Sequence, residues 1–234
     1  MNRDSNKALD GTGMTSSRVR EKMVEMLEKE GVRNTEVLDA MGKVPRHIFV
    51  DSAISHRSYE NIPLPIGWQQ TISQPLTVAR ITEIVLDAMV TLKARRHRIL
   101  EVGGGCGYQA SVLSGLFNEV YAVERINSLY TRAVANINKL GQKNIHLAHK
   151  DGFEGWEEKA PFDAIIVSAA TSSVPKNLLK QLAPNACLVV PIGDGVRQKL
   201  TLVLANNGKV STKNFDEVVF VPMLEGLKNV SAND

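Results

Sequence analysis

The segment Arg98–Tyr108 constrains the fold more than any other part of the sequence. It reads as an apolar strand containing Glu101, then a glycine turn, then the start of a helix. Glycines occupy every second position from 103 to 107, and a turn without Cβ atoms lets a ligand approach the backbone closely. Glu124 ends the next apolar run, and an acid about 20 residues after such a turn is well placed to hold ribose hydroxyls in an open α/β sheet. The segment therefore predicts a site for a nucleoside cofactor.

The spacing of the glycines separates the kinds of nucleoside cofactor. A dinucleotide fingerprint that starts at Gly103 needs its third glycine at position 108, where this chain has Tyr. Starting at Gly105 places the permitted Ala110 at the end, but the glycines then lie too far past the strand. A P-loop needs Gly-Lys-Ser/Thr after the glycines, and none is present. The pattern from Glu101 to Gly107 instead resembles motif I of the class I S-adenosylmethionine methyltransferases, with an ordinary glycine-rich turn as the alternative.

Further motifs extend this resemblance over most of the chain. They are VPRHIFV at 44–50, LPIG at 64–67, QTISQP at 70–75, VERI at 123–126, DG at 151–152, GW at 155–156, APFDAIIVSAA at 160–170, VPIG at 190–193 and FVP at 220–222. In this order and spacing they resemble the protein-L-isoaspartate (D-aspartate) O-methyltransferase family, from about Arg18 to Gly226. The block Gln70–Pro75 is far more specific than the glycine turn.

The resemblance implies a fold and an activity. The implied fold is a Rossmann-like, doubly wound, mostly parallel seven-stranded α/β sheet with an N-terminal helical extension. The implied activity is methyl transfer from S-adenosylmethionine to the free α-carboxylate of L-isoaspartyl and D-aspartyl residues in damaged proteins. Two alternatives stay open: a methyltransferase for another acceptor, such as RNA or a small molecule, and a degenerate cofactor-binding protein. The intact block Gln70–Pro75 speaks against the second alternative.

The resemblance also implies roles for individual residues. Ser73 is the expected catalytic residue, with a hydroxyl that orients the substrate carboxylate; the alternative is a helix N-cap. The expected cofactor-binding residues are Ile72, Ser73, Glu101, Gly103, Gly104, Gly105, Gly107, Glu124, Arg125, Asp151 and Gly152. The expected substrate-binding residues are Leu64, Pro65, Ile66, Gly67, Gln70, Thr71, Val167, Ser168 and Ala169.

Three positions depart from the family pattern near the expected cofactor site. Gly104 and Cys106 stand where Thr and Ser are usual, and Lys150 replaces a glycine. A thiol at a helix N-terminus favours the thiolate, so Cys106 is a candidate for oxidation. The Lys150 side chain is expected to crowd the adenine, and cofactor affinity is the property that these departures affect.

Composition bounds the class of protein. The 234 residues, 43% of them apolar, suit one α/β domain with a full core. We expect residues 1–15 to be a disordered tail and residues 16–234 to be a single domain. Within that domain, residues 16–90 supply N-terminal helices and an active-site loop, and residues 91–234 form the cofactor-binding core.

The expected surroundings of the protein follow from charge and cysteine content. A net charge of +3 is too weak to indicate a nucleic-acid partner, and the basic run Lys93–Arg98 is interpreted as a solvated loop. No apolar run approaches the roughly 18 residues of a membrane span, and the polar start shows no signal peptide. Two cysteines without a Cys/His cluster predict neither disulfides nor a metal. We expect a cytoplasmic monomer whose partners are isoaspartyl proteins.

Hydrophobic periodicity predicts the order of helices and strands. Helices are expected from Ser16 or Ser17 to Glu30, over Asn34–Met41 and from Pro75 to about Ala88, and the Pro-rich stretch 61–75 is expected to be a loop. Alternation then predicts strands near 98–102, 119–123, 144–148, 163–168, 187–192, 199–204 and 216–221, with helices near 108–116, 127–140 and 175–182. Asn206-Asn207-Gly208 predicts a hairpin, so that the sheet ends in an antiparallel pair.

Overall fold

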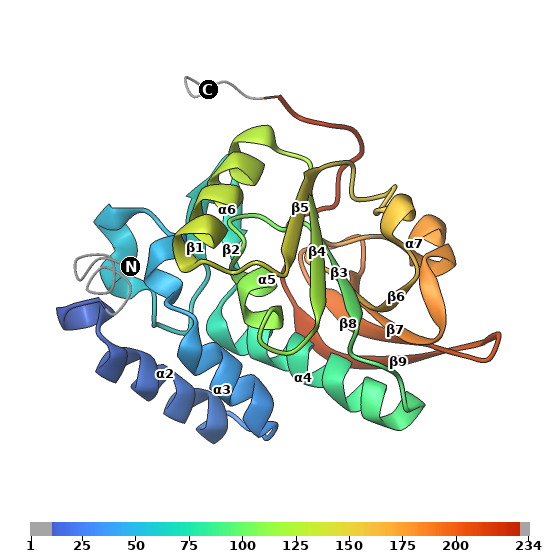
Figure 1. The fold of residues 1–234 in the computed structure, drawn as a ribbon, viewed down its shortest axis with the longest axis horizontal. Coiled ribbons are helices and arrows are strands. Elements are labelled where there is room, and N and C mark those ends of the chain that lie inside the picture. Colours follow the sequence, from blue (N-terminus) through green and yellow to red (C-terminus); the bar gives the residue numbers. More distant parts are fainter. Residues whose placement is uncertain (1–10, 230–234) are drawn as a thin grey trace.

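A seven-stranded sheet forms the centre of the molecule (Figure 1). The computed structural model describes residues 11–229. The strands lie in the order β5-β4-β3-β6-β7-β8-β9. The first five are parallel, whereas β8 pairs antiparallel with β7 and β9 with β8. Their bounds are β3 Arg98–Val102, β4 Glu119–Glu124, β5 Ile145–His149, β6 Phe162–Val167, β7 Leu182–Ile192, β8 Gln198–Asn206 and β9 Lys209–Val218. The expected doubly wound, mostly parallel sheet is confirmed.

The central strand β3 shows why the sheet is buried on both faces. Ile99 belongs to the larger hydrophobic core on one face, while Leu100 and Val102 belong to a second core on the other. From β3 the chain passes to β4 on one side, and β6 lies on the other. A crevice for ligands therefore opens at the carboxyl end of β3, where the strand order reverses.

Helices of unequal size cover the two faces (Figure 1). The larger core lies under α4 (Pro75–Leu92), α5 (Tyr108–Leu113) and α6 (Asn127–Leu140), with α2 (Ser17–Lys29) and α3 (Thr35–Lys43) packed outside α4. The other face carries the short α7 (Lys176–Lys180) and the 3₁₀ turn η4 (Glu157–Lys159). Pro75 begins α4 because a first helical position needs no backbone N–H. The N-terminal helices continue through the 3₁₀ segments η2 (Arg46–Phe49) and η3 (Ser52–Arg57).

The stretch 61–75 contains a hairpin, so the expectation of a loop is wrong. Strand β1 (Leu64–Gly67) pairs antiparallel with β2 (Gln70–Ile72). Pro65 is exposed in this two-stranded sheet, where its missing N–H costs no central ladder bond. Trp68 and Gln69 form the turn with φ of +50° and +59°, a conformation usually supplied by Asn or Gly. The sequence carries no such turn signal.

Other boundaries differ by a few residues. Helix α4 continues to Leu92, past the expected end near Ala88. The Asn206–Gly208 hairpin is confirmed, but β9 begins directly after it at Lys209 rather than at 216. In the predicted tail, residues 1–10 lie outside the described residues, whereas Gly13–Thr15 form the 3₁₀ turn η1. The Thr15 hydroxyl stabilises this turn by accepting a bond from Thr12 N and donating one to Thr12 O.

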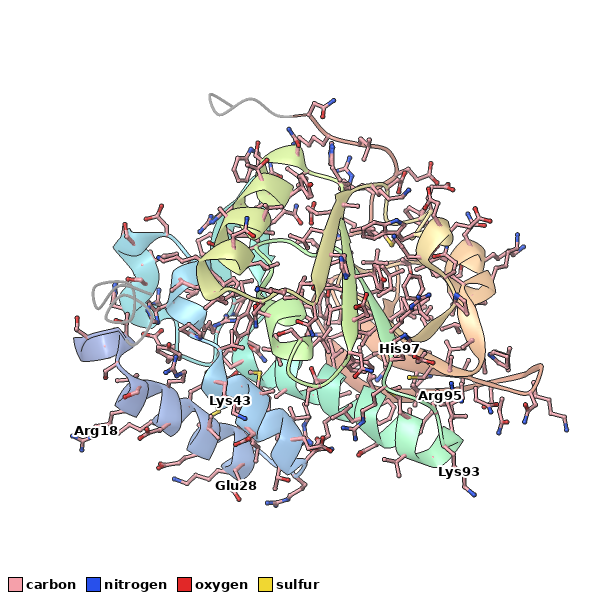
Figure 2. All side chains as sticks on the ribbon, viewed as in Figure 1. Arg18, Glu28, Lys43, Lys93, Arg95 and His97 are labelled. Atoms are coloured by element: carbon pink, nitrogen blue, oxygen red, sulfur yellow. The ribbon has the colours of Figure 1, made fainter. Side chains whose placement is uncertain are left out.

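The basic run lies at the amino end of β3, away from the carboxyl edge of the sheet. Figure 2 labels Lys93, Arg95 and His97, and all three residues are exposed. Arg96 pairs with Glu36 of α3, and Asp163 accepts bonds from the backbone of residues 97 and 98. The interpretation as a solvated loop fits these contacts.

Candidate active site

A cavity at the carboxyl edge of the sheet joins most of the residues expected to form the site. It lies where β3, β4 and β6 end, and the β1–β2 hairpin and α4 also contribute to its lining. The expected residues that line it are Ile66, Gln70, Thr71, Ile72, Ser73, Glu101, Gly103, Gly104, Gly105, Glu124, Arg125, Gly152, Ser168 and Ala169. The expected residues outside the lining are Leu64, Pro65, Gly67, Gly107, Asp151 and Val167.

The glycine turn forms one wall of this cavity. Gly103 and Gly105 have φ of +88° and +53°, a region that favours glycine, whereas the φ of Gly104 lies outside that region. The turn is anchored on β4, because the amides of Gly103 and Gly104 donate to Val123 O at 2.9 and 3.0 Å. A Cβ on Gly105 would lie 3.4 Å from Ile66 Cδ1 of the hairpin. The turn and the hairpin therefore approach each other closely across the cavity.

Gly107 serves packing rather than the cavity. It has φ of +89° and directly precedes α5. A Cβ there would lie 3.2 Å from Ile137 Cδ1 and 3.4 Å from Ala133 Cβ, both on α6. The third glycine of the alternation thus allows α6 to pack against the start of α5, and its expected contact with a cofactor stays a prediction.

Glu124 binds the glycine turn with its carboxylate. Its Oε2 accepts from Gly105 N at 2.9 Å and its Oε1 accepts from Ile126 N at 2.8 Å. Burial raises the pKa of this carboxyl, and the backbone bonds oppose that rise. Each oxygen keeps a second lone pair, so the side chain can still accept hydrogen bonds from a diol at the cavity.

Asp151 lies beside the cavity and accepts a hydrogen bond from the backbone of Gly226. Its carboxylate accepts from Phe153 N at 2.9 Å and from Gly226 N. Its neighbour Gly152 lines the cavity instead. Lys150 pairs with Glu158 at 3.1 Å and is not part of the lining. The Lys150 side chain thus lies outside the cavity lining, and its expected effect on cofactor affinity stays a prediction.

A C-terminal strap, residues 220–228, crosses the carboxyl edge of the sheet. It bridges to Ala170, with Met223 N donating to Ala170 O at 2.8 Å, and to Ile126 through Lys228. Residues 220–224 line the cavity. No role for the strap was predicted from the sequence, although the motif Phe220–Pro222 lies at its beginning.

Two buried polar residues lie deep in the cavity. Glu101 is 2% exposed, and its Oε2 has no partner among the described residues. Burial first and the nearby Glu124 second raise the pKa of Glu101 well above its usual value. Gln109, which sequence reasoning did not single out, also lines the cavity. This end of the cavity offers acceptors to a ligand.

Cys106 lines the cavity as a neutral thiol. It is 3% exposed, and burial raises its pKa to about 11. The expected thiolate is wrong because desolvation outweighs the effect of the helix that follows, which has only six residues.

Side chains alternate between the two faces of a strand, so only some of the expected substrate residues on the hairpin and on β6 face the cavity. Ile66 points inward to the cavity, whereas Pro65 and Gly67 are exposed on the other side of β1. Leu64 and Val167 are buried in the hydrophobic cores. Fewer of the expected substrate-binding side chains therefore reach this wall of the cavity than the motifs suggest.

Ser73 lines the cavity with a hydroxyl that makes no hydrogen bond to any described residue. The N-cap of α4 is Gln74, whose side chain forms no capping bond. The alternative role of Ser73 as a helix cap is thus wrong, and its hydroxyl remains available to a ligand.

Within residues 11–229, no three His, Cys, Asp or Glu side chains are grouped so that they could hold a metal ion. Over the same range no helix is both long and apolar enough to cross a membrane.

Comparisons with known proteins agree with the site. The model of the family protein-L-isoaspartate (D-aspartate) O-methyltransferase matches residues 17–228. A protein-L-isoaspartate O-methyltransferase of Dechloromonas aromatica is 49% identical over 93% of this chain and 99% of that protein. One from Halorhodospira halophila is 49% identical over 92% of this chain and 96% of that protein.

Solved structures show the same fold. A protein-L-isoaspartate O-methyltransferase superposes with a TM-score of 0.78 at 29% identity, covering 89% of this chain and 67% of the other. A Plasmodium falciparum protein described as a putative member, in complex with S-adenosyl-L-homocysteine, gives a TM-score of 0.75 at 26% identity, covering 88% and 98%. The match of the family model across nearly the whole chain, with relatives of this identity, shows that the chain belongs to the protein-L-isoaspartate (D-aspartate) O-methyltransferase family.

Proposed function

We propose that this protein transfers the methyl group of S-adenosylmethionine to the free α-carboxylate of L-isoaspartyl, and D-aspartyl, residues in damaged proteins. One observation carries the proposal: the glycine turn and the Gln70–Ser73 segment line the same cavity, and the Ser73 hydroxyl there is unpaired among the described residues. Family membership supplies the reaction, and this geometry supplies the place for both reactants.

The residues of the cavity fit the cofactor. Glu124 offers free lone pairs at the end of β4, next to the close backbone of the glycine turn. Glu101 Oε2 is a buried acceptor without a described partner, as expected where a ligand donor is missing. We propose that Glu124 holds the ribose, that Gly152 lies against the adenine, and that the end with Glu101 receives the methionyl group. When bound, S-adenosylmethionine supplies a methyl carbon on a sulfonium, which a carboxylate oxygen can attack with the thioether as leaving group.

The proposed reaction needs no general base. A substrate carboxyl is ionised near pH 7, so its oxygen is already a nucleophile. The protein's part is to orient the carboxylate and to exclude water. Ser73 donates a hydrogen bond that orients it, and Ile66, Ile72 and Val78 provide apolar walls that favour a reaction in which opposite charges disappear.

The rest of the proposal concerns the setting of the reaction. We expect the cytosol as the compartment, where the buried Cys106 and Cys187 would stay reduced. The monomeric state stays a prediction.

The test is transfer of a labelled methyl group from S-adenosylmethionine to an isoaspartyl peptide, with the aspartyl peptide as control. We expect base-labile label on the isoaspartyl peptide alone. Cofactor binding without label would point to another acceptor, such as RNA or a small molecule. Absence of both would mean that Lys150 and the altered glycine turn have disabled the cofactor site.

The role of Ser73 is tested by Ser73→Ala. Loss of one hydrogen bond to a charged carboxylate is expected to lower kcat/KM for the peptide about 10- to 100-fold. Cofactor affinity should change much less. Ser55→Ala is a matched control, because that hydroxyl binds Ser52 O within η3. Full activity of Ser73→Ala would remove Ser73 from the mechanism.

A further inference from the structure

Gln109 is a buried polar residue of the cavity for which the function proposed above has no role. It is the second residue of α5, directly after the glycine turn, and it is 8% exposed. It lines the cavity together with Glu101. A buried side-chain amide normally has partners for its polar atoms, so its contacts show what is left for a ligand.

The orientation of the Gln109 amide is fixed by Thr82 of α4. Gln109 Nε2 donates to Thr82 Oγ1 at 3.0 Å. The Thr82 hydroxyl donates its own proton to Val78 O at 2.8 Å, so its oxygen can only accept from the amide. The nitrogen must therefore face Thr82, and Oε1 is the polar atom left for a ligand. Oε1 accepts no hydrogen bond from any described residue.

A second acceptor lies nearby. The backbone N–H of Ala110, the residue after Gln109, and the Ser168 hydroxyl lower the pKa of Glu101, and Glu101 Oε2 lacks any described partner. Burial and the charge of Glu124 raise the pKa of Glu101, and a cation beside it would offset both effects. Two acceptors at a buried end of a cavity fit a ligand group with several N–H donors and a positive charge.

The order of the strands indicates which end of the cofactor lies there. Gly152 follows β5, Glu124 ends β4, Glu101 lies in β3 and Ser168 follows β6, in the spatial order β5-β4-β3-β6. With the adenine and ribose at the ends of β5 and β4, the methionyl group falls at the end of β3. Its α-ammonium is a cation with three donors. We propose that Gln109 binds the α-ammonium of the methionyl group through Oε1, beside Glu101, an inference that rests on the proposed cofactor.

The test compares two ligands and measures binding rather than turnover. Calorimetry gives the Kd of S-adenosylhomocysteine and of an analogue that lacks only its α-amino group. We expect Gln109→Leu to weaken S-adenosylhomocysteine about 10- to 100-fold, the usual effect of one hydrogen bond to a charged group. The same substitution should raise the Kd of the analogue much less, because the analogue has no ammonium for Oε1 to bind.

Thr82→Val is the matched variant, because it keeps Gln109 and removes only the group that orients its amide. We expect it to weaken S-adenosylhomocysteine by a smaller factor, with the same selectivity between the ligands. Equal weakening of both ligands by Gln109→Leu would show a merely structural role and overturn the proposal. An unchanged Kd with a raised KM for the peptide alone would assign Gln109 to the substrate and also overturn it. No binding by the unaltered protein would overturn the proposed cofactor as well.

Discussion

Gly152 is predicted to tolerate no side chain, although its backbone conformation is not restricted to glycine. A Cβ at this position would lie 2.7 Å from Val102 Cγ1 and 2.9 Å from Met223 Cε. The methionine end can turn aside, but the Val102 methyl is fixed in β3 and 2% exposed. Overpacking of this kind costs about 1–3 kcal/mol, so Gly152→Ala should lower the free energy of unfolding by that amount. The matched control is Gly195→Ala, where a Cβ meets nothing within 4 Å and the effect should be near zero.

A double-mutant cycle isolates the contact. Val102→Ala removes two methyl groups, which costs about 2 kcal/mol from transfer and cavity terms together. In the double variant the methyl group added by Gly152→Ala enters the vacated space. The stability loss of the double variant should therefore be smaller than the sum of the two single-variant losses by about 1 kcal/mol or more. Urea unfolding gives the free energy of unfolding of the unaltered protein, the two single variants and the double variant. Losses that add to within about 0.5 kcal/mol would refute the steric argument.

The remaining predictions concern the acidic residues. Glu124→Gln replaces one carboxylate oxygen, which accepts from Gly105 N or Ile126 N, by an NH₂ group that can only donate. We expect the free energy of unfolding to fall by about 1–3 kcal/mol and cofactor binding to weaken. An unchanged stability together with an unchanged cofactor Kd would contradict this prediction. Asp151→Asn should likewise weaken cofactor binding more than turnover at saturation, as calorimetry and kinetics can compare. Glu101 keeps its proton in the fold at pH values where the unfolded chain, with a pKa of 4.5, has lost it. Its contribution to stability is thus full below 4.5 and falls as pH rises toward the raised folded pKa. Glu101→Gln should therefore gain stability relative to the unaltered protein as pH rises above 4.5, and a difference independent of pH would contradict the argument.

The parts of the fold that the sequence predicted depend on local signals. The strand–turn–helix at 98–108 carries its apolar run, its alternating glycines and its helix start within a few residues, and all were found as expected. The Asn207-Gly208 turn likewise contains residues that adopt positive φ at low cost. The hairpin at Leu64–Ile72 gave no such signal, because Trp68 and Gln69 form its turn and Pro65 reads as a strand breaker. Pairing along the two-stranded ribbon and packing of Trp68 against the hydrophobic core offset the cost of those two left-handed residues.

The site was less predictable because its shape depends on contacts between distant residues. Arg125 and Glu124 were expected from their place at the end of a strand, but nothing nearby shows that Arg125 Nε donates to Gly226 O, about a hundred positions later. The same strap places Met223 beside Gly152, and Asp151 is occupied by Gly226 rather than directed into the cavity. A cofactor that needs the Asp151 carboxylate has to compete with an intramolecular amide. The strap thus connects residues 222–226 to Asp151 and Gly152, where the adenine is proposed to bind. Substitutions at 222–226 are therefore expected to alter cofactor affinity even where they touch no reacting atom.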